Sequence, residues 1–529
     1  RFSGVNSNVV IGAAGAVFSI SALNGFGAGT YDLIKTSGGG TITGFNNATL
    51  GFSQLPTGYN YVLNKSSTAI SLVVSAGSAT SLYWAGDVSG NASWNAGTGT
   101  GATNTNWASD SPGTTDALFA PTAASTINFS ATGATGNFTN TLDQNFSVAG
   151  INFLASGTSA VTVNQGVFGA LTIGSGGITV ASGASAVSTI NAPIILGAAQ
   201  TWTVASGSEL NVMGSAPVRG TISSSGTSVF GLTLAGAGKV TLGGFNTFGG
   251  GVTTSATGTL NLNNGGTSAA SALGSGTLTI SGGTLDNTSG VSQVLLTNNL
   301  QNWNADFAFT GTNSLSLGVG AVTPSASRTV TINGGTLQVG GIIGGGAISL
   351  TKAGTGALTL SAANTFTGGF TLSAGTVNVN VPLALGAAAG TVALNGGSIN
   401  NTSGAAVVGT TAGAMTFGAD VNFLGSGALT LPGVVTLAAD RTITTSAIGG
   451  VGVANALSLT GIISGAFNLI KSGAGTLVLS GVNTLGASKT VTLAQGTLSF
   501  GNAAALGATT NTFTISGSGG AERGGVAEA

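Results

Sequence analysis

Residues 347–366 read AISLTKAGTGALTLSAANTF, and this stretch decides the fold because its pattern occurs three times. Residues 229–248 read VFGLTLAGAGKVTLGGFNTF, and residues 466–485 read AFNLIKSGAGTLVLSGVNTL. Each copy has Gly-x-Gly, two apolar residues two positions apart, and Asn-Thr before a large apolar residue. The aligned asparagines are 118 and 119 residues apart: Asn246, Asn364 and Asn483. A fixed period of this kind indicates stacked structural units.

A second series has nearly the same spacing. The run Asn-Thr-Ser-Gly ends at Gly290 and again at Gly404, 114 residues later, and Asp306 recurs as Asp420 at the same interval. Agreement between separate series argues against chance as the cause of the spacing. The chain from about residue 190 is therefore built of modules of about 115–120 residues.

The composition is typical of a repetitive β-structure. Of 529 residues 93 are Gly, 42% are apolar and only 4% are charged, and the mean hydropathy is +0.46. Typical soluble domains carry about 25% charged residues and about 7% Gly. A disordered chain is polar and rich in charge, so this composition excludes that class.

Strand-like runs of four to six residues end in Gly, Asn or Ser, as in 276–280 (GTLTI) and 375–379 (GTVNV). Gly and Asn tolerate positive φ angles and suit tight corners between strands. One coil cannot offset its own ordering cost, about 1–2 kcal/mol per residue, whereas stacked coils share hydrogen bonds and apolar faces. The sequence therefore predicts an all-β fold, a parallel β-helix (β-solenoid) rod with coils of about 20–25 residues.

The first 150 residues differ from the rest. All four tyrosines and three of the five tryptophans lie there, and residues 83–116 are rich in Gly, Asn and Ser. We expect residues 1–78 to be a β-solenoid segment that closes a preceding module. Residues 79–150 are predicted to be a loop-rich module opener with tryptophans, and residues 151–529 the parallel β-helix. Because the chain begins with Arg1, we expect it to be part of a longer protein.

The repeat resembles a known family. The segments KAGTGALTLSAANTFTG (352–368) and KSGAGTLVLSGVNT (471–484) are similar to the autotransporter-associated β-strand repeat, also called the passenger-associated transport repeat, and 235–249 is similar to a lesser degree. The first copy has Leu234 where the family has Lys, which argues against an essential role for that lysine. The motif positions that the resemblance implies are Asn246, Asn364, Asn483, Gly354, Gly356, Gly473 and Gly475.

The resemblance implies a right-handed β-helix that is exported across a bacterial envelope and displayed on the cell surface. We therefore expect an extracellular protein of structural or adhesive function that self-assembles end to end into filaments. Its expected partners are other copies or neighbouring modules of a larger chain, together with a surface glycan. The alternative is a carbohydrate-active β-helix enzyme or a glycan-binding module.

The sequence offers little for catalysis. The chain has no His and no Cys, and its 12 acidic residues are scattered. Asp286 and Asp306, separated by the length of one predicted coil, are the strongest candidate pair for polysaccharide cleavage, but the repeat has Asn400 in place of Asp286. The competing interpretation is two solvated corner residues, and we expect no enzyme, cofactor or metal site. Asp110 and Asp116 are expected to form Asx-turns.

Three tryptophans are the candidate glycan contacts. Trp84, Trp94 and Trp107 could stack on a sugar ring, or they could fill the irregular end of a solenoid core. The second interpretation is favoured. A net charge of −1 leaves no basic surface for nucleic acid or an anionic membrane, and no apolar run is long enough for a membrane-spanning helix.

Overall fold

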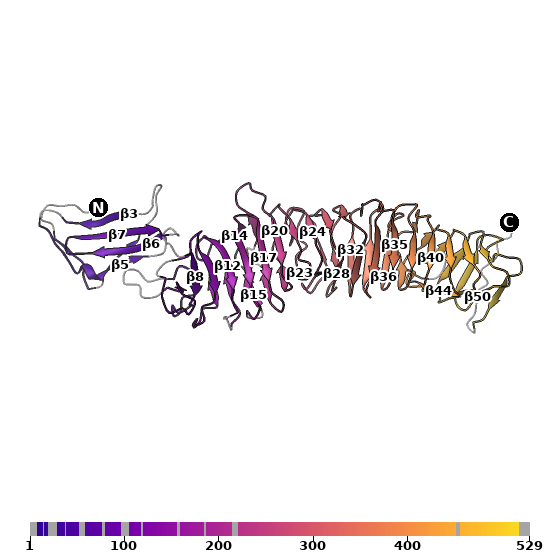
Figure 1. Cartoon of the computed structure of the whole chain (residues 1–529), viewed down its shortest axis with the longest axis horizontal. Coiled ribbons are helices and arrows are strands. Elements are labelled where there is room, and N and C mark those ends of the chain that lie inside the picture. Colours follow the sequence, from indigo (N-terminus) through magenta and orange to yellow (C-terminus); the bar gives the residue numbers. More distant parts are fainter. Residues whose placement is uncertain are drawn as a thin grey trace. The chain divides into compact units, whose positions relative to one another are not determined.

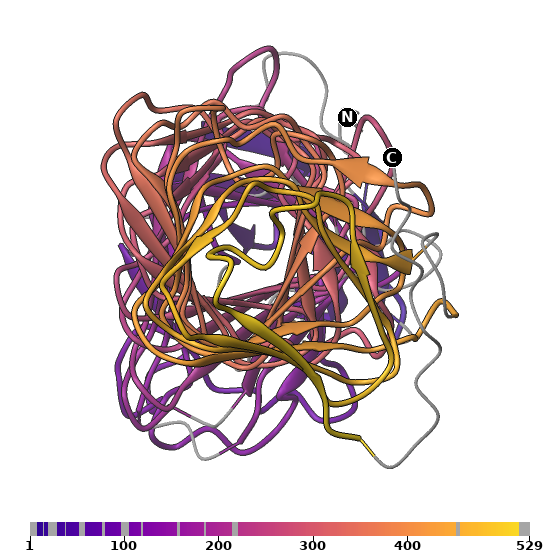
Figure 2. The same ribbon diagram turned by 90° about the vertical axis from the view of Figure 1, so that its right-hand side faces the viewer.

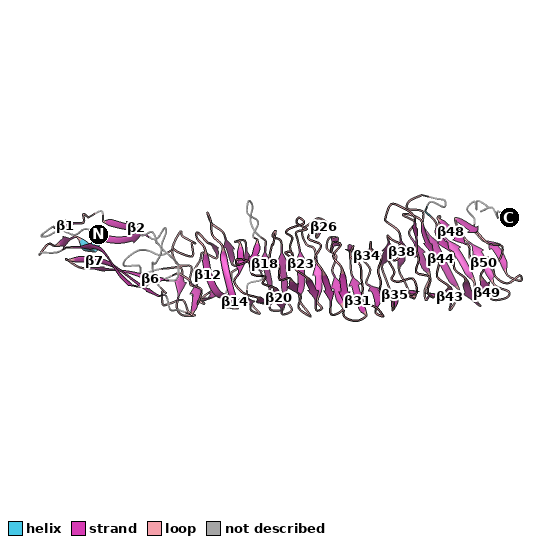
Figure 3. Ribbon diagram, turned by 90° about the horizontal axis from the view of Figure 1, so that it is seen from above, coloured by secondary structure: helices cyan, strands magenta, loops and turns pink. Residues whose placement is uncertain are grey.

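The described residues form strands and loops with one short 3-10 helix among them, η1 (Phe45–Asn47), as Figure 3 shows. The computed structural model describes residues 8–13, 15–19, 29–36, 39–51, 59–76, 80–96, 105–117, 120–155, 159–184, 187–213, 221–450 and 455–517. The chain divides into two compact units, Arg1–Gly250 and Gly251–Ala529. Both units are dominated by parallel strand pairs, which confirms the predicted β-solenoid class. The predicted segment boundaries at residues 78 and 150 stay predictions.

The first unit begins with a mixed arrangement of strands. An antiparallel sheet has the order β3 (Gly29–Lys35), β7 (Ala69–Ala76), β6 (Tyr59–Lys65). Two parallel pairs accompany it, β1 (Val9–Val10) with β4 (Ile42–Thr43) and β2 (Ala16–Ser19) with β5 (Ala48–Gly51). Ile42, Ile70 and Leu72 are buried in the small core that these strands share.

The rest of the first unit consists of two sheets of stacked strands (Figure 1). The strands of one sheet are β9 (Trp107–Ala108), β8 (Ser81–Trp84), β10 (Thr126–Phe129), β12 (Phe146–Phe153), β14 (Leu171–Val180), β17 (Gln200–Val204) and β20 (Leu232–Ala235). In the same sheet β16 (Ile194–Leu196) pairs with β14, and β19 (Ile222–Ser224) pairs with β16. The strands of the other are β11 (Thr139–Thr141), β13 (Thr162–Asn164), β15 (Val187–Ile190), β18 (Glu209–Val212) and β21 (Lys239–Leu242). Among the described pairs of these two sheets only β8 and β9 are antiparallel.

The second unit contains four sheets. The first consists of β22 (Val252–Thr253), β24 (Leu278–Ile280), β27 (Gln301–Trp303) and β30 (Val322–Pro324). The second consists of β23 (Thr259–Leu262), β25 (Thr284–Asp286), β28 (Phe307–Phe309), β31 (Arg328–Ile332), β33 (Ser349–Ala353), β35 (Gly369–Leu372), β37 (Val392–Leu394), β40 (Met415–Phe417), β43 (Val435–Leu437), β46 (Ile463–Gly465) and β49 (Thr484–Leu485).

The other two sheets of this unit are built in the same way. The third consists of β26 (Gln293–Val294), β29 (Leu315–Ser316), β32 (Thr336–Val339), β34 (Ala357–Leu360), β36 (Thr376–Val379), β38 (Ser398–Asn400), β41 (Val421–Phe423), β44 (Arg441–Thr445), β47 (Leu469–Ser472), β50 (Thr490–Leu493) and β52 (Thr512–Ile515). The fourth consists of β39 (Val407–Val408), β42 (Leu429–Leu431), β45 (Leu457–Leu459), β48 (Thr476–Leu479) and β51 (Thr497–Phe500).

The coils differ in length, as the contacts between successive coils show. The hydrogen bond from Asn364 to the carbonyl of Ala384 spans 20 residues. The bond from the backbone N–H of Asn468 to Asp440 spans 28 residues. Some coils are thus longer than predicted, because their corners carry extra residues.

The coils enclose an apolar interior. In Figure 2 the coils of the second unit, orange to yellow, are seen end on and surround a common interior. Apolar residues at alternate strand positions fill it, as Leu469 and Leu477 do, and both are buried. Because successive side chains of a strand point to opposite faces, this arrangement explains the period-2 pattern of the sequence.

Candidate functional site

The second unit contains two copies of the repeat, residues 347–366 and 466–485, and each copy places a lysine inside the coil. In β33, the alternating residues Leu350 and Lys352 are both buried, and the exposed fraction of Lys352 is 0%. Lys471 in β47 is likewise 0% exposed. A fully buried Lys is rare in proteins unless its charge is compensated, so its contacts decide what it does.

The two ammonium groups bind backbone carbonyls in the same way. Lys352 Nζ donates to the carbonyls of Ala353 (2.7 Å), Gly354 (2.7 Å) and Ala374 (3.1 Å). These three bonds match the three N–H donors of an ammonium group. The first two acceptors belong to the lysine's own corner and the third to the next coil. The side chain therefore ties two successive coils together from inside.

The second copy repeats the geometry. Lys471 Nζ donates to Ser472 (2.7 Å), Gly473 (2.6 Å) and Gln495 (2.9 Å). Neither lysine takes part in the two ion pairs found in the described part of the chain, Lys35–Asp32 and Lys239–Glu209. Burial lowers the pKa of Lys352 and of Lys471 to about 8.

The first copy lacks this contact. Leu234 occupies the lysine position there and is buried, while the displaced Lys239 is on the surface and pairs with Glu209 over 3.0 Å. The sequence had argued against an essential role for the lysine, and its position inside the coil was not predicted. A usable signal existed, because Leu350 and Lys352 alternate on the inward side of one strand.

The motif asparagines bridge three coils. Asn364 Oδ1 accepts from the backbone N–H of Ile343 (2.8 Å), and Asn364 Nδ2 donates to the carbonyl of Ala384 (2.6 Å). Ile343 lies one coil before Asn364, and Ala384 one coil after it. The amide oxygen and the amide nitrogen of this buried side chain both form hydrogen bonds to neighbouring coils. The side chain therefore holds a corner in place where the backbone hydrogen bonds between strands stop.

The other two asparagines are placed alike. Asn483 accepts from the N–H of Ile463 (2.8 Å) and donates to the carbonyl of Ala505 (2.6 Å). Asn246 in the first unit accepts from the N–H of Ile222 (2.8 Å). In an ordinary coil the same N–H bonds a backbone carbonyl, as Val435 does with Ile462 (2.8 Å). The asparagine side chain thus replaces a backbone acceptor.

The motif glycines are required by conformation and by space. Gly354 and Gly473 have φ angles of 75° and 76°, which favour glycine. A Cβ on Gly354 would lie 2.3 Å from the carbonyl oxygen of Ile332. Gly356 and Gly475 approach the preceding coil as closely, with carbonyl oxygens 2.5 Å and 2.4 Å from their would-be Cβ atoms.

Successive repeats use successive sheets of the second unit. Lys352 lies on the second sheet and its Gly-x-Gly leads into β34 of the third, whereas Lys471 lies on the third sheet and leads into β48 of the fourth. The cause is that the repeat period is not a whole number of coils. Equivalent side chains of the two repeats therefore lie on different faces.

The three candidate glycan-stacking tryptophans are inside the first unit. Trp84, Trp94 and Trp107 are each 0% exposed, and the ring centroids of Trp84 and Trp107 are 4.8 Å apart. Trp94 Nε1 donates to Asn140 Oδ1 (2.7 Å), and Trp107 Nε1 donates to the Trp94 carbonyl (2.9 Å). Such rings have no free face for a sugar, which argues for the core-filling interpretation.

The candidate carboxylates are not brought together. Thr284 lies opposite Ala308, so Asp286 and Asp306 are at opposite ends of the β25–β28 pair. Asp286 is buried and accepts from the N–H (3.0 Å) and the hydroxyl (2.7 Å) of Thr312. Asp306 accepts from the N–H of Thr329 (2.9 Å). Both carboxylates hold corners.

Asp110 also holds a turn. Its carboxylate accepts from the Thr114 hydroxyl (2.5 Å) and from the N–H groups of Thr114 and Thr115 (both 2.9 Å). These bonds, that of the Thr114 hydroxyl first, lower the pKa of Asp110 to about 2. Asp116 accepts from the hydroxyl of Thr105 (2.9 Å).

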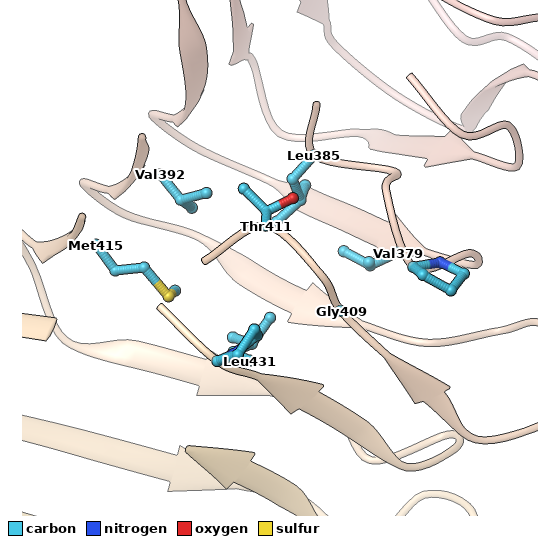
Figure 4. Close-up of a pocket in the computed structure, with 9 residues that line it drawn as sticks. Val379, Leu385, Val392, Gly409, Thr411, Met415 and Leu431 are labelled. Atoms are coloured by element: carbon cyan, nitrogen blue, oxygen red, sulfur yellow. The ribbon is translucent and has the colours of Figure 1, made fainter. Parts of the chain in front are cut away.

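The interior offers no room for a ligand at the cavity in Figure 4. This cavity of about 10 Å³ is lined by apolar side chains such as Val379, Val392 and Met415, and the Thr411 hydroxyl beside them already bonds the Gly386 carbonyl (3.1 Å). A water needs at least about 10–15 Å³. Within the described residues no group of three Asp or Glu side chains could hold a metal ion, and no helix there is suited to crossing a membrane.

Two comparisons with known proteins found sequences that are similar to the chain. The family described as passenger-associated-transport-repeat matches residues 350–379 and 469–500, the segments that hold the two buried lysines. The chain is 38% identical over 135 residues to "Adhesin BmaC autotransporter" of Brucella suis biovar 1 (strain 1330). That match covers 24% of this chain and 4% of the relative, so the chain spans a small part of the relative's length. No solved structure matches the chain.

The residues matched by the family are those that the sequence singled out in its second and third copies. The chain therefore carries passenger-associated transport repeats of the autotransporter-associated class on a parallel β-solenoid, and both comparisons indicate a secreted protein of the cell surface.

Proposed function

We propose that the chain is a structural and adhesive segment of a bacterial cell-surface β-solenoid and that it is not an enzyme. One observation carries this proposal: the buried polar groups of the repeats are consumed in holding coils together. Lys352, Lys471, Asn364 and Asn483 each bond more than one coil or corner. Cohesion of this kind serves a chain that must keep its coils stacked without disulfides, since it has no Cys.

The adhesive part of the proposal rests on the relative, which is named an adhesin. Beads coated with the chain should bind cultured epithelial cells more than beads coated with the same chain unfolded by heat. The same beads are also tested on surfaces coated with matrix proteins. Equal binding of the folded and the heat-unfolded chain to cells and to matrix proteins would contradict an adhesive function.

We also propose that copies associate end to end. A strand edge without a partner can pair with another chain, and β52 pairs only with β50 among the described strands. Its residues Thr512 to Ile515 are all exposed. Negative-stain images at high protein concentration should show filaments, and single particles throughout would contradict this assembly.

The alternative of a polysaccharide-cleaving enzyme has a direct test. The structure separates Asp286 from Asp306, so we expect no turnover of acidic polysaccharides. Turnover that is lost in Asp286→Asn and kept in Asp420→Asn would overturn the non-enzymatic proposal.

A further inference from the structure

The second unit has an open groove on the outer face of its second sheet. The groove is shallow and open to solvent, and its volume is about 450 Å³. Its floor is formed by Thr284, Ala308 and Thr331, which lie directly opposite one another on β25, β28 and β31. Their short side chains on three adjacent strands leave space that longer side chains would fill.

Hydrogen-bonding groups surround this floor. Asp306 Oδ1 accepts from the N–H of Thr329, whereas Asp306 Oδ2 accepts no hydrogen bond from the residues that the structure describes. The hydroxyls of Thr257, Thr284 and Thr331 also have no side-chain partner among those residues. The groove thus offers one carboxylate oxygen and several hydroxyls to a ligand.

These groups suit a neutral sugar better than other ligand classes. Sugar hydroxyls donate to a carboxylate and both donate to and accept from threonine hydroxyls. A calcium ion needs six to eight oxygen ligands, and Asp306 is the one carboxylate among the described residues that line the groove. An anionic ligand would be repelled by the same carboxylate.

The next repeat contains the same corner with a longer side chain at the floor position. Asp420 accepts from the N–H of Thr442 (2.8 Å), as Asp306 does from Thr329, so this carboxylate contact belongs to the fold. The position of Ala308 is taken there by Asn422, which lies opposite Thr444. Asn422 is exposed, and its side chain is longer than that of Ala308. The difference between the repeats therefore lies in the floor.

We propose that this groove is a binding subsite for a neutral oligosaccharide, with Asp306 and the threonine hydroxyls as its hydrogen-bonding groups. The proposal deepens the adhesive function and rests on it for its biological meaning. It also moves the glycan contact away from Trp84, Trp94 and Trp107, whose rings are buried.

The test is saturation-transfer NMR on the full chain with lactose, mannotriose, maltotetraose and chitotriose at millimolar concentration. Ala308→Asn introduces the residue that the next repeat carries, so the fold should accept it. Asp306→Asn keeps the oxygen that accepts from Thr329 and removes the charge. Asp420→Asn is the matched control in the equivalent corner.

We expect at least one of these sugars to bind and its affinity to fall at least tenfold in Ala308→Asn and in Asp306→Asn, with Asp420→Asn unchanged. The melting temperatures of all variants should match that of the parent chain. Absence of binding by all four sugars, or equal binding by Ala308→Asn, would overturn the proposal.

Cell adhesion separates this proposal from the adhesive function. If no sugar binds in the groove while the parent chain and Ala308→Asn adhere to cells equally well, the groove proposal fails and the adhesive function stands. If sugars bind in the groove while the parent chain does not adhere, the adhesive function fails and the groove proposal stands.

Discussion

The ammonium of Lys352 donates a hydrogen bond to the carbonyl of Ala374, 22 residues later and one coil further on, over 3.1 Å. The equivalent bond of the next repeat joins Lys471 to Gln495, 24 residues later, over 2.9 Å. The two lysines lie on different sheets, yet each reaches from its own corner to the corner of the next coil. This contact makes the lysine a link between coils, and it leads to the first two predictions.

Replacing Lys352 by Met should destabilise the second unit. The substitution keeps the buried volume but leaves three carbonyls unbonded. Hydrogen bonds from charged groups contribute about 1.5–3 kcal/mol each, and the removed burial cost of the charge offsets part of this loss, so we expect a net loss of about 2–4 kcal/mol. Urea unfolding measures the change.

Lys239→Met is the control for this substitution. Lys239 is 43% exposed and its pair with Glu209 is on the surface, where such pairs contribute about 0–1 kcal/mol. An equal effect of both substitutions on the urea midpoint would show that the buried carbonyl contacts of Lys352 contribute no more than a surface pair.

The stability of the chain should rise with pH above about 8. The pKa of each buried lysine is about 8 in the folded chain, against an ordinary value of 10.5. Between these values the unfolded chain binds more protons than the folded chain, so the free energy of unfolding increases with pH, by about 3 kcal/mol per lysine over the window. Below pH 8 both states are protonated and this contribution is constant.

The measurement compares the parent chain with the double variant Lys352→Met, Lys471→Met at pH 7 to 10.5. The difference in unfolding free energy between them should grow in favour of the parent across this range. A constant difference would mean that the carbonyls keep the lysine pKa near its ordinary value.

Asn364→Asp should destabilise the chain at neutral pH, and the stability of the variant should recover in acid. The new carboxylate still accepts from Ile343 but has no N–H for the Ala384 carbonyl, and a buried unpaired charge costs about 3 kcal/mol or more. Burial raises the pKa of such an Asp, so stability should return as pH falls through that raised value. Unfolding midpoints at pH 4 to 7 measure the effect.

Asn263→Asp is the matched control. Asn263 is half-buried, and its Oδ1 accepts from the N–H (2.8 Å) and the hydroxyl (3.2 Å) of Thr288, both of which can donate to a carboxylate. Its stability should change little over the same pH range. Acid sensitivity of the same size in both variants would show that the bridge to Ala384 is unimportant.

Gly354→Ala should cost clearly more than Gly290→Ala. Both glycines have positive φ angles, 75° and 84°, but a Cβ on Gly290 meets nothing within 4 Å, while one on Gly354 lies 2.3 Å from the Ile332 oxygen. The backbone conformation alone costs about 1–2 kcal/mol, and the clash adds to it only at Gly354. Thermal unfolding of the two variants provides the comparison, and equal losses would contradict the close approach of coils.

The class of fold could be predicted because its signals are local. The alternation of apolar residues in runs such as 375–379, the glycine corners and the period of Asn246, Asn364 and Asn483 are all readable along the chain. The parallel strands and the family match confirm the fold class and the recognition that followed from them.

The interior of the repeats could not be predicted in the same way. A lysine on a strand is expected in solvent, because burying its charge costs several kcal/mol unless hydrogen bonds compensate. Only the folded coil shows that three carbonyls converge on Lys352 and on Lys471. The partners of Asn364, which lie one coil away on either side, are likewise set by the lengths of two corners.

The sequence by itself determined that the chain forms short strands, that glycine and asparagine turn its corners, and that the pattern of Asn246, Asn364 and Asn483 recurs at a nearly constant interval. These properties depend on residues that are neighbours in the chain, so the sequence alone predicts them. The tertiary structure decided which residues meet across coils, that Trp84, Trp94 and Trp107 are buried, and that Asp286 and Asp306 are apart. The corners of successive coils differ in length. The number of residues in each coil therefore decides which residue lies opposite which in the next coil.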